Sequence, residues 1–178
     1  EQKATAPPDL SQVLSELKPK RSKSKGSHGI LVKGESGLMV RLARCCNPVP
    51  GDVIVGYITR GRGVSVHRAD CPNISSEPDE FERMIEVEWD IGVDDLYKVT
   101  IEITALDRPG MLTDIMMVLA EHKINASTVN AKTFKDKRAL ISMCIDTKNI
   151  GQLENIMAKM KRVRDVFEVH RASSVTGG

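Results

Sequence analysis

Aromatic side chains are scarce in this chain of 178 residues, where Phe, Trp and Tyr together make up 3%. So few large side chains limit the size of any single hydrophobic core, and the length suits two small domains with a tail. No apolar run approaches the roughly 18 residues that a membrane-spanning helix needs, and the first residues lack the apolar segment of a secretory signal. We therefore expect a cytoplasmic chain with no membrane partner and with reduced cysteines.

The signature motifs of common enzyme classes are also missing. The sequence contains no GxSxG elbow, no Walker loop, no HExxH pair and no dinucleotide-binding glycine fingerprint. We predict that the chain is not an enzyme by itself.

The net charge of +2 conceals an uneven distribution. Residues 77–95 are strongly acidic, whereas the segments before and after them are basic. Basic segments attract phosphate backbones, although a run of charge also serves simply as a solvated surface. The pattern predicts basic modules on either side of an acidic joint.

Three of the four cysteines lie within residues 41–71, a stretch that is rich in arginine. Cys45 and Cys46 are adjacent, and His67 and Cys71 follow after a predicted strand, turn and strand, so the two pairs could meet across a hairpin. A tetrahedral Cys3His zinc site fits these residue types, but adjacent cysteines are a rarer spacing than CxxC. Buried reduced thiols with a structural histidine, or a labile disulfide, are the alternatives. A zinc hydrolase fits less well, because four protein ligands leave no open position and Asp70 is the only nearby acid.

The same stretch, RLARCCNPVPGDVIVGYITRGRGVSVHRADCPN, closely resembles the zinc-finger-like or ribosome-intersubunit domain of long RelA/SpoT-type (p)ppGpp synthetase/hydrolases. This resemblance implies that Cys45, Cys46, His67 and Cys71 are ligands of a structural Zn2+. It also implies contacts between the domain and ribosomal RNA through arginines. The candidates for these contacts are Arg41, Arg44, Arg60, Arg62 and Arg68.

Arg60, Arg62 and Arg68 lie in one predicted hairpin. Glycines flank Arg62 and let its loop approach a surface, and an arginine binds phosphate with two parallel hydrogen bonds. A simple polar turn is the alternative interpretation.

The N-terminal segment, residues 1–28, predicts a short amphipathic helix at 9–18 and a basic flexible linker at 18–27. The linker is either an RNA-attracting tail or a soluble tether. Residues 29–92 predict a small, mostly β domain with short strands at 30–32, 38–41, 53–59 and 64–67. We expect residues 85–89 to close the same sheet as its last strand, after a helical turn at 78–82.

Residues 96–172 predict a second domain of different character. Strands are expected at 97–106, 124–134, 138–146 and 166–171, with helices at 111–122 and 149–161. The order βαββαβ gives a ferredoxin-like sheet with both helices on one face, so the whole chain belongs to the α+β class. Leu112, Ile115, Met116 and Leu119 form the predicted buried stripe of the first helix, Cys144 is predicted to be a core thiol, and residues 173–178 are predicted to be a disordered tail.

Residues 97–171 resemble ACT domains, on the strength of LDRPGMLTDIMMVLAEHKINASTVNAKT. In members of that family that bind amino acids, the ligand lies at a subunit interface against the turn after the first strand. The resemblance implies effector-binding positions at Asp107, Arg108, Pro109, Gly110, Met111, Asn125, Ala126 and Ser127. A turn built only for packing is the alternative.

Together the two resemblances imply the non-catalytic, regulatory C-terminal region of a stringent-response enzyme. The parent protein would be a GTP pyrophosphokinase, a (p)ppGpp pyrophosphohydrolase, or both. The implied partners are the ribosome through its large-subunit RNA, deacylated tRNA and the N-terminal catalytic half of the same protein. The alternative is an ACT module that senses a branched-chain amino acid and forms a homodimer.

Overall fold

The computed structural model describes residues 28–33, 38–61, 63–74, 81–90, 92 and 94–173. The predicted helix and basic linker of residues 1–27, most of the predicted turn at 78–82 and residues 174–178 lie outside this described part, as does Arg62. No helix within the described ranges is long and apolar enough to cross a membrane.

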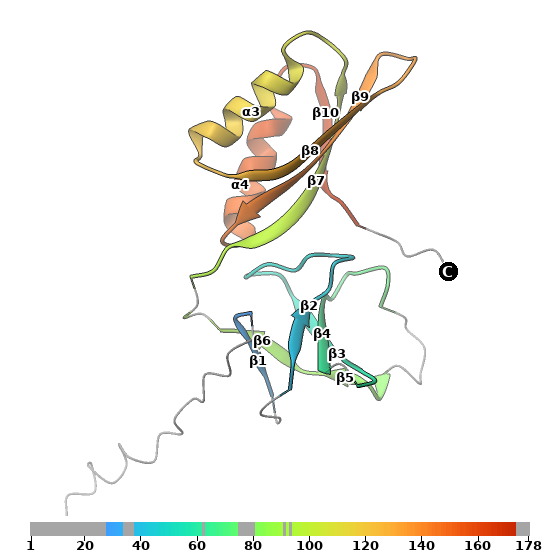
Figure 1. The fold of residues 1–178 in the computed structure, drawn as a ribbon, viewed down its shortest axis with the longest axis vertical. Coiled ribbons are helices and arrows are strands. Elements are labelled where there is room, and N and C mark those ends of the chain that lie inside the picture. Colours follow the sequence, from blue (N-terminus) through green and yellow to red (C-terminus); the bar gives the residue numbers. More distant parts are fainter. Residues whose placement is uncertain are drawn as a thin grey trace, which may run out of the picture.

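The N-terminal region is built from short strands, which the lower half of Figure 1 shows. Its larger sheet has the order β2-β4-β3-β5, in which β2 runs parallel to β4 and the other pairs are antiparallel. The strands of this sheet are β2 (Val40–Leu42), β3 (Ile54–Thr59), β4 (Gly63–Arg68) and β5 (Met84–Ile85). A second, two-stranded sheet pairs β1 (Ile30–Val32) with β6 (Val87–Trp89).

One part of the expected β arrangement is wrong. Residues 85–89 do not close a single sheet, because the segment divides between the two sheets: β5 pairs with β3, and β6 pairs with β1. Gly56 of β3 explains why β5 and β6 pack so close to it. A side chain at Gly56 would collide with Ile85 and with Val87.

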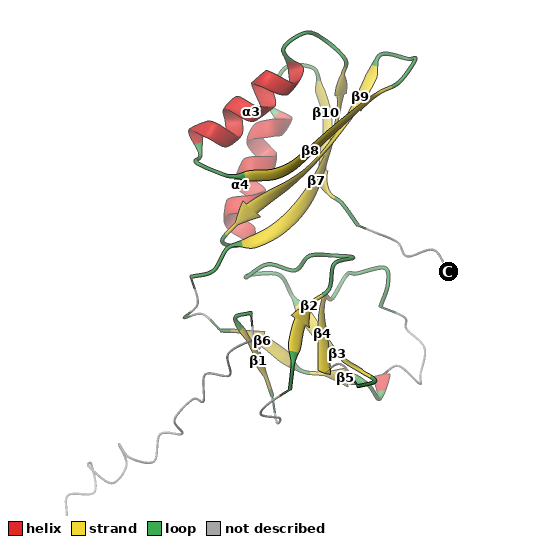
Figure 2. Ribbon diagram, viewed as in Figure 1, coloured by secondary structure: helices red, strands yellow, loops and turns green. Residues whose placement is uncertain are grey.

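The C-terminal region has the predicted βαββαβ order and forms one antiparallel sheet, β10-β7-β9-β8. Its strands are β7 (Tyr97–Leu106), β8 (Ala126–Thr133), β9 (Arg138–Thr147) and β10 (Val166–Arg171). Helices α3 (Met111–Glu121) and α4 (Ile150–Lys161) cover one face of this sheet, as Figure 2 shows. The α+β fold class is therefore confirmed.

Alternation along the central strands builds the C-terminal core. Every second residue of β7 and β9 is buried beneath the helices, including Ile101 and Ile141. The buried stripe of α3 consists of Met111, Ile115 and Leu119.

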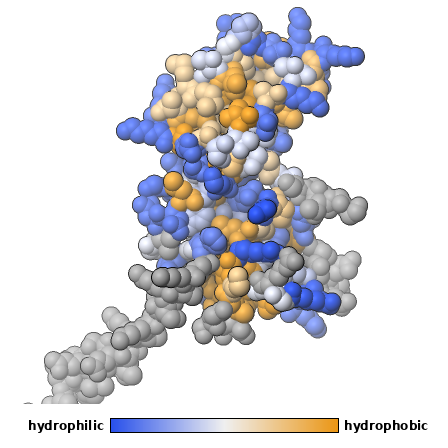
Figure 3. All heavy atoms as spheres, in the orientation of Figure 1, coloured by the Kyte–Doolittle hydropathy of each residue, from blue (hydrophilic) through white to orange (hydrophobic). Residues whose placement is uncertain are grey.

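Two predictions for buried positions in this domain are wrong. Leu112 and Met116 are 41% and 37% exposed, because they lie at the edge of the stripe that Met111 occupies. Figure 3 shows hydrophobic residues among hydrophilic ones on the visible surface of the C-terminal region, at the top of the view. Cys144 alternates with Met143 and Ile145, so it faces the other side of the sheet and is only partly buried.

A loop of the N-terminal region penetrates the C-terminal core. Val49 is fully buried and belongs to the same hydrophobic cluster as the residues of β7, β9 and α4. The carbonyl oxygen of Pro50 accepts a hydrogen bond from the backbone N–H of Ile150 at 2.9 Å. Gly51, with φ of 100°, leaves no room for a side chain against Ile150. The two regions are thus joined by packing as well as by the chain.

A buried ion pair completes this joint. The Arg171 guanidinium, at the end of β10, donates to both carboxylate oxygens of Asp52 at 2.8 and 3.0 Å. It also donates to the carbonyl oxygen of Asn47 at 2.7 Å. Trp89 donates to the Asp52 carbonyl and packs edge-on against Tyr97, with ring centroids 5.6 Å apart.

Candidate metal centre

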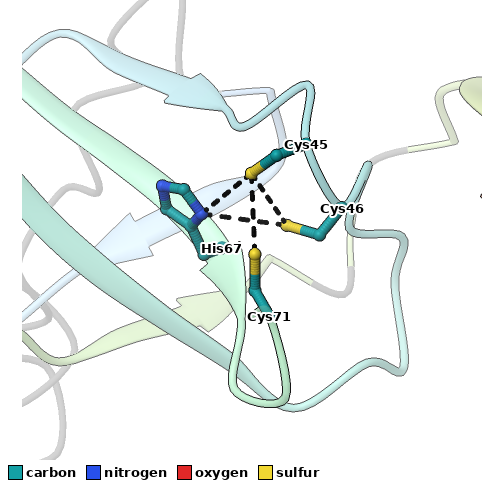
Figure 4. Close-up of side chains that lie close together, drawn as sticks. All are labelled: Cys45, Cys46, His67 and Cys71. Carbon is teal, nitrogen blue, oxygen red and sulfur yellow. Dashed lines mark hydrogen bonds between the residues drawn. The ribbon is translucent and has the colours of Figure 1, made fainter. Parts of the chain in front are cut away.

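Three cysteines and a histidine from separate parts of the N-terminal region converge on one point (Figure 4). Cys45 and Cys46 lie in the turn after β2, which stays in register with β4 because Ala43 donates to the Val66 carbonyl. His67 lies in β4, and Cys71 follows it in a turn closed by a hydrogen bond to the Arg68 carbonyl. The parallel pairing of β2 with β4 therefore carries the cysteine turn to the end of the strand that holds the histidine.

The donor atoms match the size of a tetrahedral zinc site. Zn–S bonds of about 2.3 Å and Zn–N bonds of about 2.0 Å imply donor separations of about 3.5 to 3.8 Å. The Cys45 sulfur lies 3.3 Å from His67 Nδ1, 3.6 Å from the Cys71 sulfur and 3.9 Å from the Cys46 sulfur. All four donor atoms lie within 4.8 Å of one another, and the residues fit this metal.

All four cysteines of the chain are free thiols, so the structure does not contain the labile disulfide that the sequence left open. Burial raises the pKa of the Cys46 thiol to about 12 and also raises the pKa of Cys71. Burial, and after it the positive charge of Arg41, lowers the pKa of His67. Without a cation, buried thiols keep their protons, and metal binding would release them.

Neighbouring polar groups hold the donors in place. His67 directs Nδ1 at the sulfurs, while its Nε2 lies 3.2 Å from the Ser65 hydroxyl. The backbone N–H of Arg68 points at the Cys46 sulfur at 3.4 Å. Such outer contacts fix the orientation of a ligand ring, and N–H donors stabilise thiolate charge.

The arginines predicted to contact RNA differ in their surroundings. Arg41, Arg44 and Arg60 are exposed, and within the described ranges no carboxylate forms an ion pair with them. Arg68 is different, because its guanidinium is paired with Asp70 and is largely covered. Arg41 and Arg44 also line a cavity of about 730 Å³ that reaches Cys45 and His67.

The structure separates the predicted effector-binding positions into two groups. Residues 107–111 follow the end of β7, at the level of Arg138, whereas Ala126 pairs with Ile145 near the opposite end of β9. At about 3.4 Å per residue, seven positions of β9 between Arg138 and Ile145 place the groups more than 20 Å apart. One chain does not bring them together.

The polar side chains of Arg108 and Asn125, one in each group, already have hydrogen-bond partners within the chain. Arg108 donates to Asp165 at 2.9 Å and to Asp114 at 2.8 Å, so its charge is already neutralised. Asn125 donates to Asp146 at 2.9 Å. Gly110 has φ of 81° and begins α3 without a side-chain cap, which leaves helical N–H groups available.

Sequence reasoning missed the residues that connect the centre to its surroundings. Ser65 was read only as part of a strand, and its contact with His67 follows from period-two alternation along β4. Asp52 and Arg171 are 119 positions apart, and no local pattern links them. Tyr57 and Thr59 line the cavity because β3 pairs with β4.

Comparison with protein families identifies two matching regions. The family model described as the RelA/SpoT RIS domain matches residues 30–90, and the model described as an ACT domain matches residues 93–171.

Similar curated proteins are much longer than this chain. Over 158 residues it is 40% identical to the bifunctional (p)ppGpp synthase/hydrolase RelA of Mycobacterium tuberculosis, which covers 87% of this chain and 21% of that protein. It is 36% identical to the GTP pyrophosphokinase of Streptomyces coelicolor, with 98% of this chain and 20% of the relative covered. The GTP pyrophosphokinase of Escherichia coli K12 is also 36% identical, with 91% and 22% covered. The chain thus spans about a fifth of the length of these relatives.

Among solved structures, the ACT domain from the GTP pyrophosphokinase of Chlorobium tepidum is similar to the C-terminal region. It is 28% identical, with a TM-score of 0.39, and the match covers 43% of this chain and 99% of that domain.

Proposed function

Because this chain is the RIS and ACT regulatory region of a RelA/SpoT protein, we propose that it senses stalled ribosomes for a stringent-response enzyme. In this proposal the RIS domain contacts large-subunit ribosomal RNA and deacylated tRNA. The contact controls the synthesis and hydrolysis of (p)ppGpp by an N-terminal catalytic half, in the cytoplasm. RNA shifts the balance of activities only by its differential affinity for one arrangement of the protein.

The observation that carries the proposal is the combination of a cluster of four potential metal donors with arginines that have no acidic partner among the described residues. Arg41, Arg44 and Arg60 lie on the same small domain as the centre and are exposed. Uncompensated, exposed guanidinium groups suit phosphate oxygens. A metal that clips the loops around them would hold these charges in a fixed arrangement.

We assign the centre to a structural Zn2+ held by Cys45, Cys46, His67 and Cys71. The metal would supply folding free energy to a domain with a small core, and it would take no part in catalysis. Elemental analysis of the purified chain under reducing conditions tests this assignment. We expect about one zinc per chain, lost in the Cys45→Ser/Cys46→Ser double variant and retained in Cys144→Ser. Equal metal content in the wild type and the double variant would contradict the assignment.

Ribosome association tests the RNA contact. Arg41→Glu/Arg60→Glu reverses two exposed charges, and we expect weaker co-sedimentation with ribosomes and a shallower salt dependence. Each lost phosphate contact lowers the slope of log affinity against log salt by about 0.9 for duplex and 0.7 for single strands. Lys135→Glu/Arg162→Glu on the ACT domain is the matched control, since it also reverses two exposed charges that have no acidic partner among the described residues. Unchanged association of the double variant would count against these arginines.

A second function is supported by the two separated groups of effector-binding positions. In a dimer, residues 107–111 of one chain could meet residues 125–127 of its partner, and the N–H groups at the start of α3 would bind a carboxylate. We therefore propose that a branched-chain amino acid binds at the interface between two ACT domains. Light scattering should show a dimer that the amino acid stabilises. A monomer at all concentrations, with no heat of binding, would exclude this site.

A further inference from the structure

A cavity lined by both polar and apolar groups lies beside the candidate metal centre, on the face of the β2-β4-β3 sheet that carries Arg41, Ser65 and Tyr57. Its volume is about 730 Å³, which is within the usual range of small-ligand sites. The lining combines two cations with hydroxyl groups and one aromatic ring: Arg41, Arg44, Tyr57, Thr59, Ser65 and His67.

The charge of this cavity is uncompensated. None of the residues that line it is acidic, and no described carboxylate pairs with Arg41 or Arg44. By contrast, Arg171 at the joint between the two domains is paired with Asp52. Two guanidinium groups that line one cavity, with no acidic partner among the described residues, favour an anion with several oxygens, such as a phosphate.

Strand register arranges the other groups in a row. Arg41 of β2 pairs with Ser65 of β4, and Ser65 pairs with Tyr57 of β3. Neighbouring strands are about 4.8 Å apart, so the tyrosine lies about 10 Å from the arginine with a hydroxyl between them. A nucleotide has the same order of groups, with a charged phosphate, a hydroxylated sugar and a flat base.

The tyrosine and the serine are held by the fold. Arg83 donates to the Tyr57 hydroxyl at 3.4 Å, which restrains the ring. Ser65 is only 6% exposed, and its hydroxyl lies 3.2 Å from His67 Nε2. A preformed aromatic surface costs little entropy when a base stacks on it.

From this arrangement we propose that the cavity binds one unpaired nucleotide of RNA, with its phosphate at Arg41 and Arg44 and its base against Tyr57. The proposal rests on the proposed RNA contact and narrows it, because a concave site takes a base that has left the helix rather than a duplex surface. Arg60 lies outside the cavity lining, so its contact with RNA would be to the backbone only.

The test compares three probes on the full chain by fluorescence anisotropy. They are a labelled RNA hairpin with one bulged adenosine, the same hairpin fully paired, and the bulged hairpin with an abasic site at the bulge. We expect the bulged probe to bind about 10-fold more tightly than the other two, which matches the loss of one stacked base. Free AMP serves as competitor.

Variants distinguish binding of a base in the cavity from binding of RNA to the rest of the domain surface. Tyr57→Leu should remove the preference for the bulge and leave binding of the paired hairpin unchanged. Arg41→Gln and Arg44→Gln change exposed side chains and should leave the sheet intact. Each should lower the affinity for the bulged hairpin more than the affinity for the paired hairpin. Arg60→Gln should weaken both probes equally and keep the preference.

The outcomes distinguish the general RNA contact of the RIS domain from the specific nucleotide site in the cavity. Equal affinity for the three probes, with Arg60→Gln weakening all of them, would overturn the cavity assignment and keep the RNA contact. No binding of any RNA would overturn both. Competition by AMP at the affinity of the bulged RNA would also overturn the assignment, since the cavity would then take a free nucleotide.

Discussion

The RIS and ACT domains differ in what holds each of them together. The ACT domain has strands of up to ten residues and a continuous core in which Ile101, Ile145 and Leu153 are completely buried. The RIS domain has strands of six residues or fewer, and among its described residues the hydrophobic core contains five buried side chains, of which Val64 and Val66 are the most enclosed. Beside that core lies a separate cluster of Ala43, Cys46 and Cys71. A small core stabilises a domain only marginally, so the RIS domain needs further support.

Two features of the structure bear on that support. One is the group of Cys45, Cys46, His67 and Cys71, whose donor atoms lie close enough to hold a metal that would tie the turn after β2 to the end of β4. The other is the ACT domain itself, which buries Val49 in its own core and pairs Arg171 with Asp52. Because Arg171 also binds the carbonyl of Asn47, the loop that carries Cys45 and Cys46 is held from the ACT side. The comparison teaches that the domain with the smaller core gains buried contacts from its neighbour, and in our proposal a metal adds to them.

Removal of the metal is expected to produce the largest difference in stability between the two domains. Zinc chelation is expected to unfold the RIS domain, since apparent binding free energies of structural zinc reach about 10 kcal/mol. Hydrogen exchange of the β3 and β4 amides should accelerate, while amides of β7 and β9 stay protected. Retained protection in β4 after complete chelation would show that the core of the RIS domain suffices.

Loss of the buried ion pair should affect both domains. Arg171→Met leaves the Asp52 carboxylate buried without its partner, and we expect a loss of about 3 to 5 kcal/mol in the free energy of unfolding. Urea denaturation measures this free energy. Zinc retention during the unfolding transition reports whether the RIS domain stays folded. Arg164→Met is the control, because the side chain of Arg164 is 90% exposed. Equal stability of the two variants would contradict a structural role for the joint.

A cavity in the ACT core should act mainly on that domain, although Val49 of the RIS domain packs in the same cluster. Leu153→Ala removes a fully buried side chain of α4 and should cost about 3 kcal/mol of unfolding free energy. Zinc content and RNA binding should not change. Leu112→Ala, at a 41% exposed position of α3, should cost less than about 0.5 kcal/mol. Loss of zinc from Leu153→Ala would show that the two domains unfold as one unit.

A smaller effect than that of the buried core and ion-pair variants is expected at Tyr97, whose hydroxyl donates to the His28 carbonyl at 3.2 Å and so ties the start of β7 to the residues that precede β1. Tyr97→Phe should cost about 1 kcal/mol at neutral pH. Burial, followed by the charges of Asp95 and Asp90, raises the pKa of Tyr97 above its ordinary value of 10.0. The stabilising contribution is therefore complete below pH 10 and declines as the pH rises through the pKa of the folded state.

The measurement for Tyr97 is the difference in unfolding free energy between wild type and Tyr97→Phe from pH 8 to 11. The difference should shrink above pH 10. A constant difference over this range would mean that the hydroxyl does not titrate differently in the folded chain.

Much of the ACT domain was predictable from the chain. The alternation of residues 97–106 and 138–146 predicted both central strands, because one buried and one open face enforce period two. Asn149 was included in the second helix and proves to be its cap, with its side chain accepting from the Gln152 N–H. Boundaries of this kind depend on one dihedral angle, which patterns do not resolve.

The RIS domain was less predictable. Its strands were found, but residues 85–89 were assigned to one sheet, since strands of two and three residues carry too little pattern to choose a partner. The four donors Cys45, Cys46, His67 and Cys71 were identified from residue type and spacing, and the structure brings them together. The role of these donors as metal ligands and of the arginines as RNA contacts remains a proposal.

By itself the sequence determined the elements of each domain and the residues that would meet at the centre, because hydrophobic period, turn residues and ligand spacing are local properties. Only the tertiary structure decided the burial of Val49, the pairing of Asp52 with Arg171 and the cavity between Arg41 and Tyr57. These contacts join residues from different strands or domains. Their energies depend on the distance and burial of both partners, which no single segment of the chain specifies.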